Sequence, residues 1–225
     1  MIFASELLLS AILGIVVPTG SPAPAVSTAA APAPLRTIVT VKSSPFCNAL
    51  AQHFNAAFVP LSGNNRNLEI VNSGLVEIDE AFSHPDYANR LQKARAAIVA
   101  ANDQIAASLP GIALQIRAVR EAASQTGDAK AASQTSDSAA ALESAYSKER
   151  QLSIDLTNLA QAMMDANMNL GDRPLGTLDA IEMPKEMSDI KAYLRFDGRR
   201  DLIVQSESKA IDIAYDVANQ KCSTP

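Results

Sequence analysis

Two cysteines, Cys47 and Cys222, are the residues of this chain whose chemistry is easiest to assign. Each lies on the apolar stripe of a predicted helix, Cys47 in the first helix and Cys222 in the last. A reactive thiol needs an adjacent histidine or a basic environment, whereas Phe46 and Asn48 flank Cys47. An even pair of cysteines in an oxidising compartment is normally bridged. The pair therefore predicts one structural disulfide that closes a helical bundle.

A metal ion or haem is the second chemistry that the side chains suggest. His53 lies one residue away from the apolar stripe of the first helix, and helical bundles bind haem iron through histidine and methionine. Methionine thioethers also suit Cu(I). Because the chain has no Cys-x-x-Cys-His motif and methionine usually fills cores, we expect no cofactor and keep this hypothesis as the alternative. Its candidate ligands are His53, Met163, Met164 and Met168, with Met183 and Met187 as further thioethers for copper.

A small acidic patch between residues 77 and 86 contains one imidazole. If the helix continued to His84, Glu80 and His84 would share one face at i,i+4 spacing and would form a weak candidate site for a divalent cation. Pro85 directs the backbone of His84 away from the helical region. That separates the pair, so a solvated helix end is the simpler interpretation.

Signatures of the common enzyme classes do not occur in the sequence. The chain has two histidines, no Gly-x-Ser-x-Gly elbow and no glycine-rich phosphate loop. Its net charge is −5, with no basic cluster beyond Arg199-Arg200, which disfavours nucleic-acid binding. We therefore expect a protein that is not an enzyme. A catalytic set that one sequence does not reveal is the third hypothesis.

Residues 44–225 are predicted to form one all-α domain. Aromatic residues make up only 4% of the chain, and its many alanines favour helix formation and close helix–helix packing. Apolar residues at spacings of three and four predict a first helix from Ser44, which would cap it, to Pro60. A turn over 62–67 and a second helix over 68–82 follow.

The second half of the domain is predicted to be a long helical hairpin and a last helix. A helix over 85–124 with a kink at Pro110, a polar loop over 125–138 and a helix that ends at Leu170 would form the antiparallel hairpin. A short helix is expected over 185–194. The last helix is expected over 204–221, antiparallel to the first because the disulfide must join their ends.

The apolar stripes of the last two long helices predict which residues face the core. In the helix that ends at Leu170, Glu149 is the one polar residue on the stripe. The stripe of the last helix is predicted to consist of Val204, Ser208, Ile211, Tyr215, Ala218 and Cys222. These patterns favour an elongated bundle whose helices pack with coiled-coil-like stripes.

The first 43 residues indicate export. Residues 7–17 form an apolar run that is shorter than the roughly 20 residues a membrane span needs but has the length of a signal-peptide core. Ala23-Pro24-Ala25 provides a small-x-small cleavage pattern, although Glu6 stands where a signal peptide carries positive charge. We therefore expect a signal-peptide-like segment over 1–25 and a disordered tether rich in Pro, Ala and Ser over 26–43.

Together these patterns favour a secreted or periplasmic helical-bundle protein with a structural or protein-interaction role. Its partner would be a protein of unknown identity, with no nucleic acid and no stable transmembrane segment after removal of the signal. The alternative is a metal- or haem-binding bundle of the four-helix type that uses His53 and the methionines.

Overall fold

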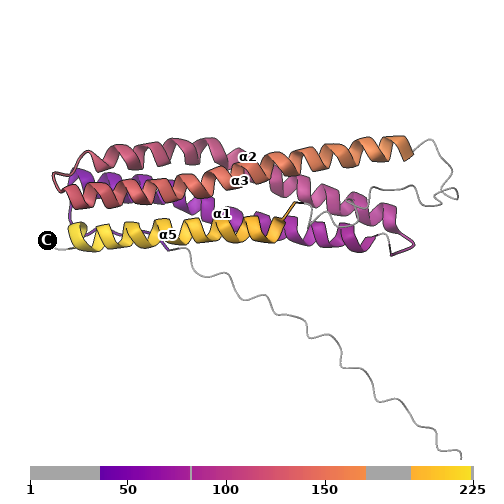
Figure 1. Cartoon of the computed structure of the whole chain (residues 1–225), viewed down its shortest axis with the longest axis horizontal. Helices are drawn as coiled ribbons and strands as arrows, with labels where there is room; N and C mark the ends of the chain where they lie inside the picture. The colour runs from indigo at the N-terminus through magenta and orange to yellow at the C-terminus, as the bar shows by residue number, and fades with distance from the viewer. Residues whose placement is uncertain (1–35, 82, 171–193, 224–225) are drawn as a thin grey trace, which may run out of the picture. The chain divides into compact units, whose positions relative to one another are not determined.

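The part of the chain that its structure, a computed structural model, describes contains four helices. That part comprises residues 36–81, 83–170 and 194–223, without the side chains of 163–170. It belongs to one unit, Leu35–Pro225. The helices are α1 (Pro45–Ala81), α2 (Tyr87–Ala123), α3 (Ala129–Leu170) and α5 (Phe196–Cys222), as Figure 1 shows.

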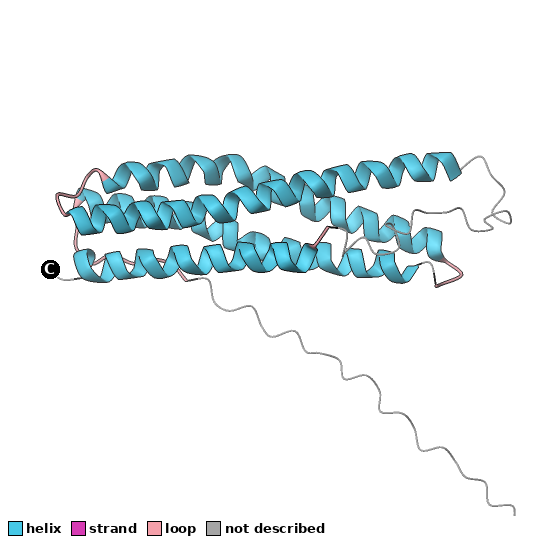
Figure 2. Cartoon of the chain, in the orientation of Figure 1, coloured by secondary structure: helices cyan, strands magenta, loops and turns pink. Residues whose placement is uncertain are grey.

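The helices of this unit run alternately in opposite directions and pack side by side (Figure 2). α1 packs against α2 and α5, and α3 packs against the same two helices from the other side. The α2–α3 pair is the predicted long antiparallel hairpin. The predicted all-α bundle closed by one disulfide is therefore confirmed.

The first helix differs from the predicted pair of helices joined by a turn over 62–67. α1 continues through that segment, and Pro60 lies inside it. Glycine and asparagine favour turns, but Asn64 is buried and its Nδ2 donates to Ser108 Oγ of α2 at 2.8 Å. Because a buried polar side chain needs such a partner, packing against α2 favours the helical form of this segment.

The third helix begins earlier than the sequence pattern predicts. α3 starts at Ala129, so most of the predicted loop over 125–138 is helical. The cap is Asp128, whose Oδ1 accepts a hydrogen bond from the Ala131 N–H at 2.9 Å. A hydrogen-bonded ion pair with Lys221 of α5, together with the Ala131 amide, lowers the pKa of Asp128. The cap thus also joins the start of α3 to the end of α5.

The last helix also begins before its predicted start at residue 204. α5 starts at Phe196, and the predicted turn over 198–200 is helical. The side chains of Phe196 and Ile203 are fully buried, and this burial outweighs the low helix propensity of the glycine between them. The short helix predicted over 185–194 lies outside the described residues except for its last residue.

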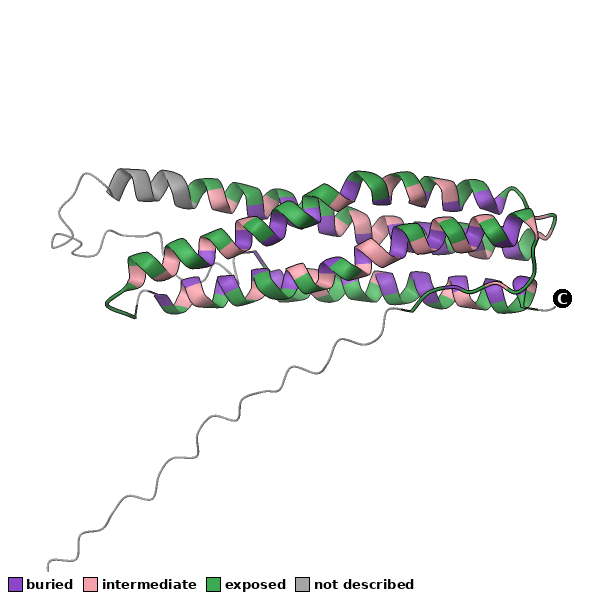
Figure 3. Cartoon of the chain, turned by 180° about the vertical axis from the view of Figure 1, so that it is seen from behind, coloured by how far each residue is buried: buried purple, intermediate pink, exposed green. Residues whose placement is uncertain are grey.

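The apolar core consists of two clusters, one in each half of the bundle, and the buried residues line the inner faces of the helices (Figure 3). The cluster at the disulfide end includes Leu50, Phe54, Ile116, Leu142 and Val217. The other cluster includes Leu75, Ile98, Ile105, Leu156 and Phe196. Each cluster takes side chains from all four helices, so the core of each half of the bundle requires all four.

Among the described helices, α2 is the one that length and composition would allow to cross a membrane. Buried residues make up 33% of its most apolar stretch. Ile98, Ile105 and Ile112 belong to the two core clusters. These buried isoleucines account for only part of the apolar character of α2, since most of that stretch is not buried.

Gly74 marks a close approach between α1 and α2. A Cβ on Gly74 would lie 2.6 Å from Ile98 Cγ1 and 3.2 Å from the carbonyl oxygen of Ala94. Gly63, which also lies inside α1, has nothing within 4 Å of the same position. The two glycines therefore form a matched pair within one helix, one at a crowded position and one at an open position.

We expect Gly63→Ala to stabilise the protein by about 0.5–1 kcal/mol, because alanine loses less backbone entropy in a helix. Gly74→Ala is expected to destabilise the protein by about 1–2 kcal/mol. The cost of overpacking a methyl group against Ile98 is larger than the gain from the reduced loss of backbone entropy. Urea unfolding of both variants measures the difference. Equal stabilisation by the two substitutions would contradict the close approach of the helices.

A non-helical segment, residues 36–42 and here named the strap, lies against α1 before that helix begins. Asn55 of α1 holds the strap at Ile38: its Oδ1 accepts from the Ile38 N–H at 2.9 Å, and its Nδ2 donates to the Ile38 carbonyl oxygen at 2.8 Å. The Ile38 side chain is buried in the core. The last part of the predicted tether over 26–43 is therefore docked on the bundle.

The strap is also bound to α5. The Tyr215 hydroxyl donates to the Thr37 carbonyl oxygen at 2.7 Å. At the end of α5, the carbonyl oxygen of Cys222 accepts from the N–H groups of Val41 and Lys42 at 3.0 and 2.8 Å. The strap thus connects the first and last helices in addition to the disulfide.

Asn55→Ala is expected to release the strap, because both backbone groups of Ile38 would lose their partner. We expect faster hydrogen exchange at the Ile38 amide and a loss of about 1–2 kcal/mol in unfolding free energy. The exposed Asn48, on the same helix, provides the control Asn48→Ala. Unchanged hydrogen exchange at the Ile38 amide in the Asn55→Ala variant would show that the two hydrogen bonds of Asn55 do not hold the strap.

Candidate functional site

A layer of polar side chains crosses the interior of the bundle between the two apolar clusters. Each helix contributes to it: Asn64 and Asn65 from α1, Ser108 from α2, Glu149 from α3 and Glu207 from α5. Glu149 and Glu207 are only 1% and 4% exposed. On every helix these residues separate the stretch that packs in one cluster from the stretch that packs in the other. These five residues are named the central polar layer.

Glu149 is the least satisfied residue of the central polar layer. Neither of its carboxyl oxygens has a hydrogen-bond partner in the part of the chain that the structure describes. The nearby Asn64 amide directs its Nδ2 to Ser108 at 2.8 Å and only partly offsets the effect of burial. Burial, and secondly the neighbouring carboxylate of Glu207, raise the pKa of Glu149 to about 8.

Glu207 has one hydrogen bond within the central polar layer. Its Oε2 accepts from Asn65 Nδ2 at 2.8 Å, while Oε1 has no partner among the described residues. Burial raises the pKa of Glu207 to about 7, against the lowering effect of the Asn65 amide. The interior therefore holds two neighbouring carboxyl groups and, near neutral pH, disfavours the ionised form of both.

Basic side chains near the layer are engaged elsewhere. Lys148, which precedes Glu149, donates to the hydroxyls of Ser144 and Ser206, the latter at 3.1 Å. Arg199 pairs with Asp155 at 2.7 Å. Beside these residues, a surface hollow of about 160 Å³ is lined by Lys148, Gln151, Arg199 and Leu202. Among the described residues, no basic side chain forms an ion pair with either buried carboxylate.

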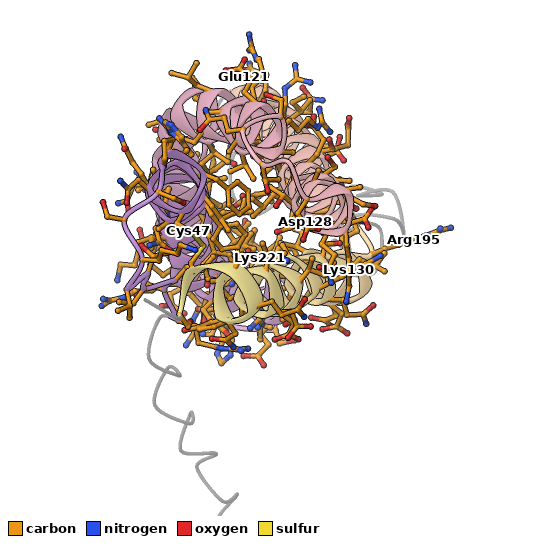
Figure 4. The ribbon with its side chains drawn as sticks, turned by 90° about the vertical axis from the view of Figure 1, so that its left-hand side faces the viewer. Cys47, Glu121, Asp128, Lys130, Arg195 and Lys221 are labelled. Atoms are coloured by element: carbon orange, nitrogen blue, oxygen red, sulfur yellow. A yellow bond between two sulfur atoms is a disulfide. The ribbon has the colours of Figure 1, made fainter. Side chains whose placement is uncertain are left out.

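The predicted disulfide between Cys47 and Cys222 is confirmed. Their Cα atoms lie 5.7 Å apart, and 175 positions of sequence separate them. Both residues are buried in the cluster at this end of the bundle. Figure 4 looks onto this end and shows Asp128 and Lys221 close to it. The bridge joins the start of α1 to the end of α5, as their predicted antiparallel arrangement requires.

Of the candidate ligands for haem or copper, His53 is the one whose side chain the structure describes. His53 Nδ1 lies 2.8 Å from Gln115 Oε1 of α2, in the half of the bundle that holds the disulfide. α3 also begins at that end, and Met163 follows Ala129 by roughly 50 Å of helix at 1.5 Å per residue. The side chains of the candidate thioether ligands, and of the two further methionines, lie outside the described part of the chain. They are those of Met163, Met164 and Met168, and of Met183 and Met187.

The pair Glu80 and His84 lies at the end of α1. Glu80 is in the last turn of the helix, and the His84 N–H donates to the Ala81 carbonyl oxygen at 3.0 Å in the turn that follows. Both side chains are exposed. Because α1 ends at Ala81, the two do not share a helical face. Among the described residues, no group of three or more His, Cys, Asp or Glu side chains is placed to hold a metal ion.

Sequence reasoning recognised one of the two buried carboxyls. Glu149 interrupts an apolar stripe, and its burial confirms that reading. The predicted stripe of the last helix is confirmed at Ile211, Ala218 and Cys222 but was wrong at Val204 and Ser208, which are exposed. The buried face also includes residues that the prediction left out: Phe196, Ile203, Glu207, Ala210, Ala214 and Val217. The spacing of the three alanines in α5 was the signal that would have identified Glu207.

Comparisons of the chain with models of protein families, with curated proteins and with solved structures find no match. What the chain can do must therefore be argued from its own residues. Two neighbouring buried carboxyls can retain protons or hold a cation, and both capacities alter the charge inside the bundle. The central polar layer is accordingly the candidate functional site.

Proposed function

We propose that this protein works outside the cytosol as a helical-bundle module with a structural or protein-interaction role. The observation that supports the proposal most directly is the disulfide between Cys47 and Cys222. Disulfides of this kind persist in oxidising compartments and are rare in the cytosol. The apolar run over 7–17 has the length of a signal-peptide core and agrees with that location.

The way in which the chain enters the bundle also supports a tethered module. The strap is held on α5 through Tyr215 and on α1 through Asn55. Arg36, at the start of the strap, forms an ion pair with Asp212 at 2.9 Å and lies over the Tyr215 ring. A pull on the upstream chain would therefore act first on the strap and the disulfide end. Such an arrangement suits a domain carried on a linker.

Each described helix carries at least one large apolar side chain that is exposed and available to a partner. Leu114 on α2 is 58% exposed, the largest such value on the described parts of the helices. The corresponding residues on the other three helices are Ile70, Ile154 and Leu202. Singly exposed apolar residues are common on soluble proteins, so these four serve as reporters of the face that a protein partner would cover.

The location is tested by the state of the cysteines in intact cells. We expect an alkylating reagent to add nothing to the protein until reductant is present, and then to add two groups, at Cys47 and Cys222. Mass spectrometry of the full-length protein gives the count. Alkylation of both cysteines without reductant would place the protein in a reducing compartment and would contradict the proposal.

The interaction role is tested by site-specific photocrosslinking in the producing cell. A photoreactive residue is placed in turn at Ile70, Leu114, Ile154 and Leu202, and at the exposed Asp103 as a control. We expect one or two of the apolar positions to yield a discrete protein adduct and Asp103 to yield none. Absence of adducts at all four positions, or equal adducts at all five, would count against a defined partner.

A further inference from the structure

We propose that the carboxylates of Glu149 and Glu207 bind one divalent cation of the class that prefers oxygen ligands, Mg²⁺, Ca²⁺ or Mn²⁺, in the centre of the bundle. This inference goes beyond the proposed function and does not depend on it. It rests on the position of the two side chains and on the oxygen atoms that their surroundings leave unpaired.

The first argument is the supply of ligand atoms. Of the four carboxylate oxygens of Glu149 and Glu207, three have no hydrogen-bond partner among the described residues. The Oδ1 atom of Asn65, whose Nδ2 already contacts Glu207, is also buried without a partner. Carboxylate and amide oxygens are the ligands of hard divalent cations, whereas thiolates and imidazoles, which softer metals select, do not occur in the layer.

The second argument is the cost of the layer without a cation. A buried polar atom without a hydrogen bond costs free energy, and a buried unpaired charge costs more. Glu149 is 1% exposed and both of its oxygens lack a partner in the described part of the bundle, so hydration from the surface does not relieve that cost. One divalent cation would neutralise both carboxylates and occupy their unpaired oxygens together.

The third argument is that no basic side chain of the described residues pairs with these carboxylates. Lys148 is the nearest lysine along α3, but it donates to Ser144 and Ser206. On α1, Glu69 pairs with Arg200 of α5 at the surface. The groups of α1 beside the carboxylates are the uncharged amides of Asn65, which donates to Glu207, and of Asn64, which lies near Glu149.

The layer has two carboxylates, which distinguishes it from sites built by three or more acidic or histidine ligands. The remaining ligand positions would fall to amide oxygens and water, as is usual for Mg²⁺ and Ca²⁺. The candidate ligand oxygens come from α1, α3 and α5, so binding would join these three helices at one level. A cation there would stabilise the folded protein against the unfolded chain.

The test uses the full-length protein, stripped with a chelator and studied at pH 8.5, with Mg²⁺, Ca²⁺ or Mn²⁺ added alone. We expect at least one of these ions to bind with a stoichiometry of one by titration calorimetry and to raise the melting temperature. Glu149→Gln and Glu207→Gln should each weaken that binding at least tenfold. Glu143→Gln, on the same helix as Glu149 but half-exposed and paired with Arg120, should leave the affinity unchanged.

Circular dichroism of each variant shows whether it is folded, and glutamine is uncharged, so both buried variants are expected to fold. Two results would overturn the inference. One is the absence of one-to-one binding of any of the three ions to the unaltered protein. The other is binding of equal strength in folded Glu149→Gln and Glu207→Gln, which would assign the ion to a surface site.

Discussion

Glu149→Gln is expected to stabilise the protein at pH 8 by on the order of 3 kcal/mol when the buffer contains a chelator. Glutamine keeps the size and polarity of the side chain but cannot ionise, so it avoids the cost of a buried charge beside Glu207. The pKa of Glu149 is about 8 in the folded protein, against 4.5 for an exposed glutamate. Unfolding in guanidinium chloride measures the difference between the two proteins.

The same substitution should change how stability depends on pH. Between about pH 5 and pH 8 the folded protein binds more protons than the unfolded chain, because the pKa values of Glu149 and Glu207 are raised to about 8 and about 7. The unfolding free energy of the unaltered protein should therefore be highest near pH 5 and fall as the pH rises towards 8. In the Glu149→Gln variant that fall should be much smaller.

Glu143→Gln is the matched control, since Glu143 lies on the same helix and is half-exposed. It should leave the slope of stability against pH unchanged. An unaltered slope in Glu149→Gln, or a loss of stability in that variant at pH 8, would show that Glu149 is ionised at little cost in the folded protein. The central polar layer would then need another source of charge compensation.

Removal of the disulfide is the second change with a large expected effect. The double substitution Cys47→Ala and Cys222→Ala should lower the unfolding free energy by about 3–5 kcal/mol, because the bridge closes a long loop in the unfolded chain. The sequence separation of the bridged residues is 175. The strap should also loosen, since Val41 and Lys42 donate to the carbonyl oxygen of Cys222.

The measurement compares the double variant with the unaltered protein, each with and without reductant. Reductant should lower the midpoint of unfolding of the unaltered protein to nearly that of the variant and should not change the variant. If reduction left the midpoint of the unaltered protein in place, the disulfide would contribute nothing to stability. The strap and the ion pair of Asp128 with Lys221 would then account for the closure of this end.

Several features of the fold were predictable because their causes are local in the sequence. The apolar stripes at spacings of three and four predicted the α2–α3 hairpin, and the position of Cys47 and Cys222 on such stripes predicted which helix ends meet. The cap of the first helix is another example: Ser44 Oγ accepts from the Cys47 N–H at 3.1 Å. Burial of Glu149 also followed from its place on a stripe.

Other features depended on contacts that the sequence does not display. Local preferences at 62–67 favour a turn, but Asn64 is buried between helices and donates to Ser108 on α2. The start of α5 contains a glycine and two arginines, yet burial of Phe196 stabilises the helical form of this segment. In both cases a tertiary contact outweighed a preference of a fraction of a kcal/mol per residue.

The sequence by itself determined the class of fold, the bridged cysteines and one buried carboxyl, because periodicity and residue type carry that information along a single helix. The central polar layer was decided only by the tertiary structure. Glu149 and Glu207 are far apart in the chain, and their proximity follows from how α3 and α5 are aligned against each other and against Asn64 and Asn65 of α1. Alignment between helices is set by packing across the core, which no pattern within one helix records.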